Sequence, residues 1–431
     1  MKKQKQQRQY FSRQSFAVML IGLIFIVGIV FKAASSKKVG TALVVNYSVN
    51  DPAFRESMGN LLGPQFLNGN RVQTLLNGNQ IFPAMLDAIK AATNNISFEN
   101  YIWETGEIGG KFKAALMERA KAGVKIHCIV DGMGTLKLKK EEMREMKDTG
   151  IKFVAFGREH WYKIKPALNH RTHRKLLIVD GKVGFIGGVC LGDKWMGDGD
   201  ESDHWRDTHF RVEGPVVLEM QGVFADNWLQ TTSDVLQGPD YFPEVEKKGN
   251  CVVQCFKSGP KNGEENARLA FLLAIAAAKK NIRLEHAYFV PDGLFIKELL
   301  AARRRGVEIE IIVPLKNDSK IGRAAARSRW GELLDAGVKF YQFKPALFHC
   351  KVMIVDDNFV TAGSVNFDNR SFRINDEANI NVLDQAFAAA QIKVFQDDKA
   401  KSLVLPQDAL KKRSWLSKCE DSCAGLFVSQ L

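Results

Sequence analysis

The sequence predicts an α/β protein built from two copies of one strand–helix domain. Segments rich in β-branched and aromatic residues alternate with segments whose apolar residues recur every three or four positions, a pattern typical of strands joined by helices. The order of these segments repeats in the second half of the chain. The 431 residues suffice for two or three domains of about 150 residues each. An apolar share of 45% and a charged share of 25% exclude a disordered, collagen-like or polytopic membrane chain.

The first copy is predicted over residues 71–235. Arg71–Leu76 is predicted as a strand that ends in an Asn77-Gly78 turn. Pro83 then stands in what we expect to be the first turn of a helix, where proline is tolerated. The strands and helices that follow alternate, beginning with a strand, in the order Ile96–Trp103, Ile108–Ala122, Val124–Val130, Lys139–Thr149 and Ile151–Phe156.

The second copy is predicted over residues 251–400 and repeats this order. A polar stretch at 236–250, which contains Gly238 and Pro243, separates the two copies. A helix is expected over Glu264–Lys280. The segments that follow it, beginning with a strand, are Ile282–Val290, Leu294–Arg305, Val307–Val313, Lys320–Ala336 and Val338–Phe343. Residues 401–431 are predicted as a C-terminal tail.

The net charge of +13 is concentrated near the N-terminus. Residues 1–38 contain eight Lys and Arg residues and no acid, so the rest of the chain carries only +5. The basic residues 1–15 precede an apolar segment at 16–34, which we expect to be a transmembrane anchor followed by a linker at 35–70. A cleaved signal peptide is the alternative. More cations precede the segment than follow it, which favours a single-pass cell-membrane protein whose globular part lies outside the cytoplasm.

The repeat is sharpest in two blocks with the pattern H-x-K-x4-D. The residues of these blocks are His173, Lys175 and Asp180, then His349, Lys351 and Asp356. Each member of the second block lies 176 positions after its counterpart, so both blocks are predicted to form the same hairpin. Side chains alternate along a strand, so the histidine and lysine of each block point to the same face. The two aspartates follow buried strands, where we expect them to form turns.

Two histidines and two lysines suit chemistry at a phosphodiester. The anion repels nucleophiles, and the leaving alcohol needs a proton. One histidine can attack phosphorus while the other protonates the leaving group, since the ordinary imidazole pKa is near 6.5. The lysines can bind phosphoryl oxygens, and this set requires no metal or other cofactor. A metal pair of His170 with His173, or of His204 with His209, is the alternative, but no cysteine or acid spacing in the repeat matches it.

The doubled pattern resembles the phospholipase D superfamily. Two flanking segments, Trp205–Pro215 and Asn366–Phe372, are similar to its bacterial cardiolipin synthase branch, and the resemblance covers roughly residues 71–400. It implies two duplicated domains of mixed sheets flanked by helices, which share one active site and form a phosphohistidine intermediate. The resemblance makes His173 the nucleophile and His349 the general acid and then base. Reversed roles are the alternative.

The resemblance also implies supporting residues. Glu377 is similar to the family's acid that hydrogen bonds the motif histidine, and Asp207 is the candidate in the first half. Ser364 and Asn366 resemble polar residues of the family's phosphate pocket. In the first half Cys190 occupies the position of Asn366, so we expect an asymmetric pocket.

The expected activity is phosphatidyl transfer, from phosphatidylglycerol to cardiolipin and glycerol. A hydrolytic phospholipase D that releases phosphatidic acid needs the same acid–base pair and is the nearest alternative. A nuclease-type phosphodiesterase is disfavoured by the small basic excess after residue 38. A binding protein with an inactive site is disfavoured by the two intact motifs. The predicted partners are therefore anionic glycerophospholipids and the membrane, not nucleic acid.

Overall fold

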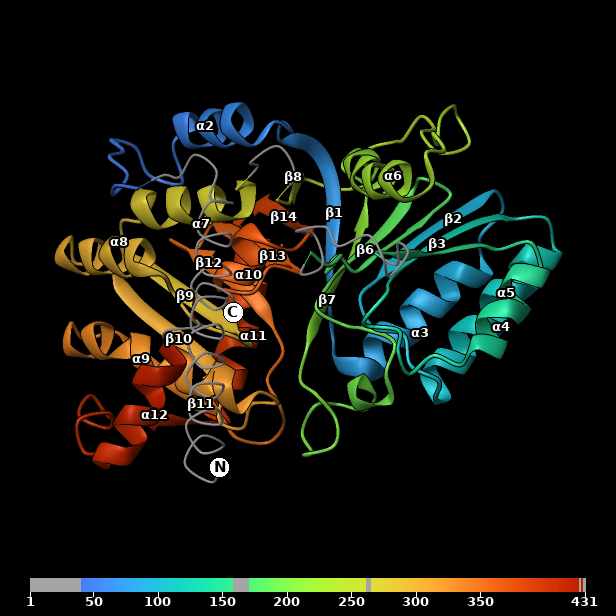
Figure 1. The fold of residues 1–431 in the computed structure, drawn as a ribbon. Coiled ribbons are helices and arrows are strands. Elements are labelled where there is room, and N and C mark those ends of the chain that lie inside the picture. The colour runs from blue at the N-terminus through green and yellow to red at the C-terminus, as the bar shows by residue number, and fades with distance from the viewer. Residues whose placement is uncertain (1–39, 158–169, 261–264, 426–427, 429–431) are drawn as a thin grey trace, which may run out of the picture. The chain divides into compact units, whose positions relative to one another are not determined.

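The computed structural model describes residues 40–157, 170–260, 265–425 and 428 (Figure 1). Its contacts separate an N-terminal unit, Met1–Thr41, from the unit Ala42–Leu431, to which every element below belongs. The apolar segment predicted as an anchor, 16–34, lies outside the described residues. Among the residues that are described, no helix has the length and apolar character needed to cross a bilayer.

The larger unit is organised around one mixed sheet with fifteen strands in the described ranges. The first half of the chain contributes β1 (Leu67–Leu76), β2 (Asn95–Asn100), β3 (Lys125–Asp131), β4 (Lys152–Phe156), β5 (Leu176–Val179), β6 (Val183–Gly187) and β7 (Thr208–Glu213). The second half contributes β8 (Cys251–Ser258), β9 (Asn281–His286), β10 (Glu308–Pro314), β11 (Lys339–Phe343), β12 (Lys351–Val355), β13 (Phe359–Gly363), β14 (Glu377–Leu383) and β15 (Ser402–Leu405).

The strand order confirms the predicted duplication of an α/β unit. The first half follows the order β1-β7-β6-β5-β2-β3-β4, and the second follows β8-β14-β13-β12-β9-β10-β11, with β15 added at the edge. In both halves the strands joined by helices, β2 to β4 and β9 to β11, pair in parallel. β1 and β8 pair antiparallel at the centre, through Leu67 with Val253 and Asn70 with Cys251. The two halves therefore share one continuous sheet.

Helices connect the strands and cover the sheet (Figure 1). The first half has α3 (Asn77–Lys90), α4 (Glu107–Lys121), α5 (Lys140–Asp148), the short 3-10 helix η2 (Asp193–Trp195) and α6 (Val217–Thr232). The second half has α7 (Asn266–Ala277), α8 (Gly293–Arg304), α9 (Lys320–Asp335), α10 (Asn369–Arg373) and α11 (Gln385–Ala400). Two further helices flank the repeats, α2 (Pro52–Leu62) and α12 (Trp415–Gly425).

One hydrophobic core is common to both halves. It combines Phe224 and Trp228 of α6 with Phe387 and Phe395 of α11, together with buried residues of the motif strands in each half. Each large apolar side chain buried in this way stabilises the fold by about 1.5–3 kcal/mol. Because the halves share both the sheet and this core, the two motif hairpins are held at fixed positions relative to each other.

The first helix of the repeat begins earlier than predicted. Asn77-Gly78, expected as a turn, starts α3, and Pro83 lies inside the helix rather than in its first turn. The cause is a tertiary contact. The Asn77 amide donates to the Asp207 carbonyl at 3.0 Å, and a Cβ on Gly78 would lie 2.2 Å from the Trp195 carbonyl oxygen. The segments around Trp195 and Asp207 therefore pack on the start of α3 so closely that position 78 needs glycine.

Two segments expected outside the repeats are part of the fold. In the predicted linker, α2 buries an apolar face, and the ring of Phe54 packs edge-on against Phe359 of β13 at a centroid distance of 5.1 Å. In the predicted tail, β15 extends the sheet beside β11. α12 packs against α9, where Arg327 forms an ion pair with Asp421 at 2.8 Å. Short amphipathic stretches of this kind do not show in the repeat pattern, since they have no counterpart in the other half.

Candidate active site

Each H-x-K-x4-D block forms the predicted hairpin, with β5 paired to β6 and β12 paired to β13. Asp180 and Asp356 occupy the turns, with φ angles of 54° and 51°, in the left-handed region that aspartate tolerates. Asp180 accepts hydrogen bonds from the backbone amides of residues 93–95, and Asp356 from those of residues 279–281. Neither aspartate lines the central cavity described below, so their contacts are those of turn-forming residues.

Each motif histidine is oriented by an acid from the opposite half. His173 Nδ1 lies 2.9 Å from Glu377 Oε1, and His349 Nδ1 lies 2.7 Å from Asp207 Oδ2. Both acids are completely buried. Because each Nδ1 donates to a carboxylate, the Nε2 atom of each ring is left for chemistry. The structure thus brings together all four of these predicted residues and pairs them across the halves.

Backbone hydrogen bonds fix this exchange of partners. The His173 amide donates to the Asp376 carbonyl at 2.8 Å, beside a bridge between Thr172 and Asp376. The His349 amide donates to the Arg206 carbonyl at 2.7 Å, beside the equivalent bridge on the other side. In both cases the residue before the histidine pairs with the residue before its acid. The site therefore has the same approximate twofold symmetry as the sheet.

Different donors hold the two acids. Glu377 accepts hydrogen bonds from Ser364 Oγ and from Ser371 Oγ, the second at 2.7 Å. Asp207 accepts one from the indole Nε1 of Trp195 at 3.1 Å. Ser371 and Trp195 stand 176 positions apart, so the offset of the motifs is a sequence signal that could have identified both. Ser364, expected in the phosphate pocket, instead lies behind the cavity wall, where it holds the acid.

The motif lysines are buried beside the histidines. Lys175 Nζ donates to the His173 carbonyl at 2.5 Å, and Lys351 Nζ donates to the His349 carbonyl at 2.7 Å. Lys351 Nζ also lies 3.3 Å from His349 Nε2. Burial lowers the pKa of both amines, that of Lys175 to about 8. Lys175 is therefore still mostly charged at pH 7, which supplies a cation next to the reacting ring atoms.

Burial also lowers the pKa of both histidines. Desolvation brings the pKa of His173 to about 4, despite the favourable charge of Glu377. Desolvation, and then the charge of Lys351, brings the pKa of His349 to about 4. Burial alone would raise the pKa of Glu377 and of Asp207, but the histidines and hydrogen bonds outweigh it and lower both. At neutral pH the site therefore holds neutral imidazoles against ionised carboxylates, a state in which Nε2 is nucleophilic.

His173 and His349 line one cavity of about 520 Å³, a volume typical of ligand sites. Asn366 also lines it, and its buried side-chain oxygen has no hydrogen-bond partner among the described residues. Cys190 takes the equivalent place in the first half, as expected from the repeat. Sequence analysis did not identify several other wall residues, namely Tyr101, Lys194, Trp205, Tyr288, Asp368 and Arg370.

The cavity explains why two strands end earlier than predicted. β2 and β9 were expected to continue to Trp103 and Val290, but both stop before these residues. Tyr101 and Tyr288 come directly after the sheet positions and line the cavity. The hydrophobic pattern continues through both segments because the residues stay buried, although they leave the sheet.

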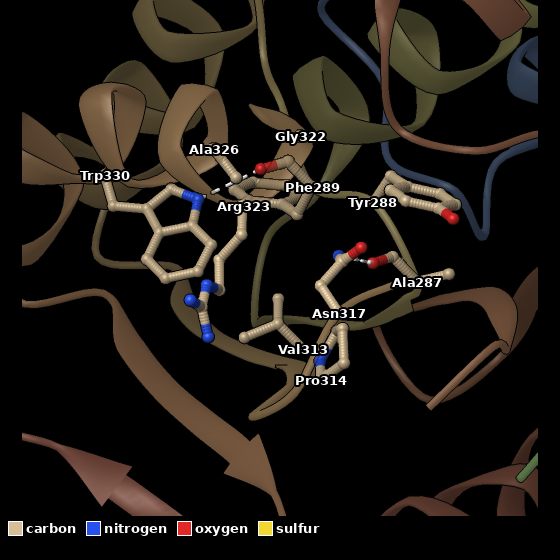
Figure 2. A pocket seen from close by; sticks show the side chains of 10 residues that line it. All are labelled: Ala287, Tyr288, Phe289, Val313, Pro314, Asn317, Gly322, Arg323, Ala326 and Trp330. Atoms are coloured by element: carbon tan, nitrogen blue, oxygen red, sulfur yellow. Dashed lines mark hydrogen bonds between the residues drawn. The ribbon is translucent and has the colours of Figure 1, made fainter. Parts of the chain in front are cut away.

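A network beside α9 fixes the wall of the second half (Figure 2). Trp330 Nε1 donates to the Phe289 carbonyl at 3.0 Å, and Asn317 Nδ2 donates to the Ala287 carbonyl at 3.4 Å. The small pocket between these side chains has a volume of about 10 Å³, close to that of a single water. Its role is structural, because it secures the chain on both sides of Tyr288.

The two histidines suggested as a metal pair bind different acids. His170 Nε2 lies 2.8 Å from Asp376 Oδ1, whereas His173 binds Glu377. Across the described ranges, no three His, Cys, Asp or Glu side chains are grouped so that they could hold a metal ion.

Two α/β halves that each supply a histidine and a lysine to a common cavity define a phospholipase D-like protein. Within this class, the chain belongs to the cardiolipin synthase branch of the phospholipase D superfamily. The family described as "Cardiolipin synthase, PLD-like domain" matches residues 85–218 and 271–399, one stretch in each half.

Curated relatives agree with this assignment. The chain is 33% identical over 343 residues to cardiolipin synthase 2 of Bacillus anthracis, covering 79% of this chain and 67% of that protein. It is also 33% identical over 360 residues to cardiolipin synthase of Staphylococcus aureus strain Mu50, covering 83% and 73%. The solved structure of phosphatidylserine synthase from Haemophilus influenzae has a similar fold, with a TM-score of 0.69, 14% identity, and coverage of 89% of this chain and 100% of that one.

Proposed function

We propose that the protein is a phosphatidyltransferase that converts two molecules of phosphatidylglycerol into cardiolipin and glycerol. The names and similarity of its relatives support this substrate class. The observation that carries the proposal is the pair of acid-bound histidines, His173 and His349, in one cavity. Transfer through a covalent intermediate needs both a nucleophile and a separate proton carrier at the same phosphorus.

In the first step His173 is the nucleophile. Its Nε2 attacks the phosphorus of one phosphatidylglycerol, and the bond from phosphorus to the glycerol oxygen breaks. Glu377 stabilises the positive charge that develops on the ring, because it accepts the Nδ1 proton at 2.9 Å. The product of this step is a phosphatidyl group bound to His173 Nε2.

His349 supplies the proton to the leaving glycerol. Its pKa of about 4 makes the resting ring neutral, because burial and the Lys351 cation disfavour the charged form. An anionic phosphodiester in the cavity favours the imidazolium, as does the Asp207 carboxylate at 2.7 Å. Substrate binding is therefore the event that protonates His349. This keeps the empty site from carrying an unneeded buried charge.

In the second step His349 acts as the base. The hydroxyl of a second phosphatidylglycerol attacks the phosphorus, its proton passes to His349 Nε2, and the bond to His173 breaks. Lys175, Lys351 and the Asn366 amide stabilise the phosphoryl oxygens in both transition states. The two-step scheme returns both histidines to their starting state.

The N-terminal segment completes the proposal. The apolar run at 16–34, with basic residues on both sides, is a single-pass anchor that holds the enzyme at the membrane where its substrates are. We infer that the globular unit lies outside the cytoplasm, because more cations precede the run than follow it.

The function is tested with the purified full-length enzyme in micelles that contain phosphatidylglycerol. We expect cardiolipin and glycerol as the main products, and a phosphatidyl group trapped on His173. Phosphatidic acid as the dominant product at high lipid density would replace the transferase by a hydrolytic phospholipase D. Cleavage of DNA without action on lipids would instead indicate a nuclease.

A further inference from the structure

Both halves direct a cation into the cavity at equivalent positions. Lys194 and Arg370 both line it, and they lie 176 positions apart, the same offset that relates His173 to His349. Neither residue belongs to the H-x-K-x4-D blocks. The cavity therefore has a second pair of cations, related by the same approximate symmetry as the histidines.

The residue after each cation anchors the segment. Trp195, which follows Lys194, donates to Asp207, and Ser371, which follows Arg370, donates to Glu377. Each cation is thus one residue away from a hydrogen bond to the acid that orients a histidine. This attachment fixes the backbone at positions 194 and 370 relative to the reacting rings.

The position of Lys194 is set by two tryptophans. Its Nζ lies 4.6 Å from the ring centroid of Trp195 and 4.1 Å from that of Trp205. The Trp205 ring is in turn 5.2 Å from the His349 ring, centroid to centroid. Lys194 is half-buried, and within the described residues no carboxylate forms an ion pair with it. An ammonium group without an acidic partner therefore stands on the His349 side of the cavity.

We propose that Lys194 binds the phosphate of the acceptor lipid and so makes the enzyme select a phospholipid rather than a neutral alcohol or water as acceptor. This inference rests on the proposed transferase function. The motif lysines are buried against the His173 and His349 carbonyls, where they serve the phosphate that is transferred. An acceptor phosphatidylglycerol brings a second phosphate, only a glycerol unit away from its attacking hydroxyl. That hydroxyl must reach His349, and Lys194 is the cation on this side.

The symmetry of the cavity supports this assignment. Donor and acceptor are the same kind of molecule, and the product carries one phosphate on each side of its central glycerol. A site with one cation from each half matches such a product better than a site built for one phosphate. A charged hydrogen bond to phosphate is also among the stronger polar contacts that a protein makes.

The reaction step affected is the second one. The acceptor hydroxyl forms the new phosphorus–oxygen bond, its proton moves to His349 Nε2, and the bond between phosphorus and His173 Nε2 breaks. Lys194 takes no part in these bond changes. It is a positioning and specificity residue, which binds an acceptor that carries a phosphate and has nothing to bind on free glycerol.

The test compares a charged with a neutral acceptor in the same micelles. Cardiolipin formation measures transfer to phosphatidylglycerol, and incorporation of labelled glycerol into phosphatidylglycerol measures transfer to the neutral alcohol. In Lys194→Met, which keeps the aliphatic stem against the tryptophans, we expect cardiolipin formation to fall about tenfold or more relative to glycerol exchange. Lys194→Arg keeps the charge and should retain most cardiolipin formation. Lys111→Met, at an exposed lysine paired with Glu107 on α4, should change neither rate.

Equal losses of cardiolipin formation and glycerol exchange in Lys194→Met would overturn the inference, since a structural role would affect both acceptors. Unchanged rates would overturn it as well. Should Lys194→Met fail to fold, as judged by its thermal transition, Lys194→Gln is measured by the same ratio. Failure of the proposed function is a separate result, because the unmodified enzyme would then form neither cardiolipin nor exchanged lipid.

Discussion

His173 and Glu377 are joined by a hydrogen bond of 2.9 Å although they are 204 residues apart in the chain. His349 and Asp207 form the reciprocal pair at 2.7 Å. Neither half therefore contains a complete catalytic pair, since each histidine depends on an acid that the other half supplies. The duplicated domain has become an enzyme in which the site exists only when both halves are folded together.

The crossed pairs predict the effect of removing the acids. Glu377→Gln and Asp207→Asn keep the size of each side chain but remove the charge that stabilises the imidazolium. We expect each to lower kcat by about 10²-fold or more, with little change in secondary structure. Asp203→Asn, at an exposed acid four positions before Asp207, is the control and should have normal activity. Full activity in Glu377→Gln would mean that the crossed hydrogen bond has no role in catalysis.

The histidines themselves are expected to act as one unit. His173→Ala and His349→Ala should each lower activity by about 10²–10⁴-fold, the range of a lost general acid–base or nucleophilic group. The double variant should be little worse than either single one. These rates are measured as cardiolipin formed per enzyme. Additive losses, or an inactivation by chelators that added zinc reverses, would rule out the metal-free scheme.

The lowered pKa of Lys175 predicts an alkaline limit to activity. Its pKa of about 8 means that the amine loses its charge as the pH rises through 8, and with it the contact to the phosphoryl oxygens. We therefore expect kcat/KM to fall above about pH 8. Lys175→Arg cannot lose its charge in this range, so any activity it retains should show no such fall. The pH profiles of both proteins decide the point, and identical profiles would assign the alkaline limit to another group.

The same lowered values predict acid sensitivity of the fold. The pKa of His173 is about 4, below that of an exposed histidine, so protons bind the unfolded chain first as the pH falls. Its contribution to stability is present above about pH 6.5 and is lost between there and pH 4, by up to about 1.4 kcal/mol per pH unit. His173→Gln should therefore flatten the fall of the free energy of unfolding with pH, as followed by urea denaturation. An unchanged slope would contradict the buried neutral ring.

The motif aspartates are expected to matter for stability rather than chemistry. Asp180→Ala removes the acceptor of hydrogen bonds from three successive amides, at 2.8 to 2.9 Å, and should destabilise the protein by about 2–4 kcal/mol. Denaturant midpoints measure this loss. The protein that remains folded should keep most of its kcat, because Asp180 does not line the cavity. A normal midpoint with lost activity would instead make Asp180 part of the chemistry.

The anchor is tested by extraction. A full-length enzyme that retains the apolar segment at 16–34 should stay in membranes after carbonate treatment, whereas a chain that begins at Ser36 should be released. Mass spectrometry of the mature protein provides the decisive control. A mature N-terminus near residue 35 would replace the anchor by a cleaved signal peptide.

The sequence by itself determined the fold class, the duplication and the motif residues. Periodicity separated strands from helices, and the constant offset of 176 showed that His173 and His349 occupy equivalent hairpins. These are local features, because alternation along a strand and turn chemistry depend on near neighbours. The resemblance to the superfamily added Glu377 and Asp207 as acids, and each does bind a motif histidine.

Only the tertiary structure decided which acid serves which histidine. Glu377 and Asp207 do not follow the offset of the motifs, and their choice of partner depends on the bridge of Thr172 with Asp376 and its counterpart in the other half. Such bridges form between segments about 200 residues apart, so no local pattern encodes them. The same holds for Asn77, whose helical start is imposed by the Asp207 segment packed against it. Partners, strand ends and cavity walls follow from long-range contacts, whereas the elements themselves follow from the chain's own periodicity.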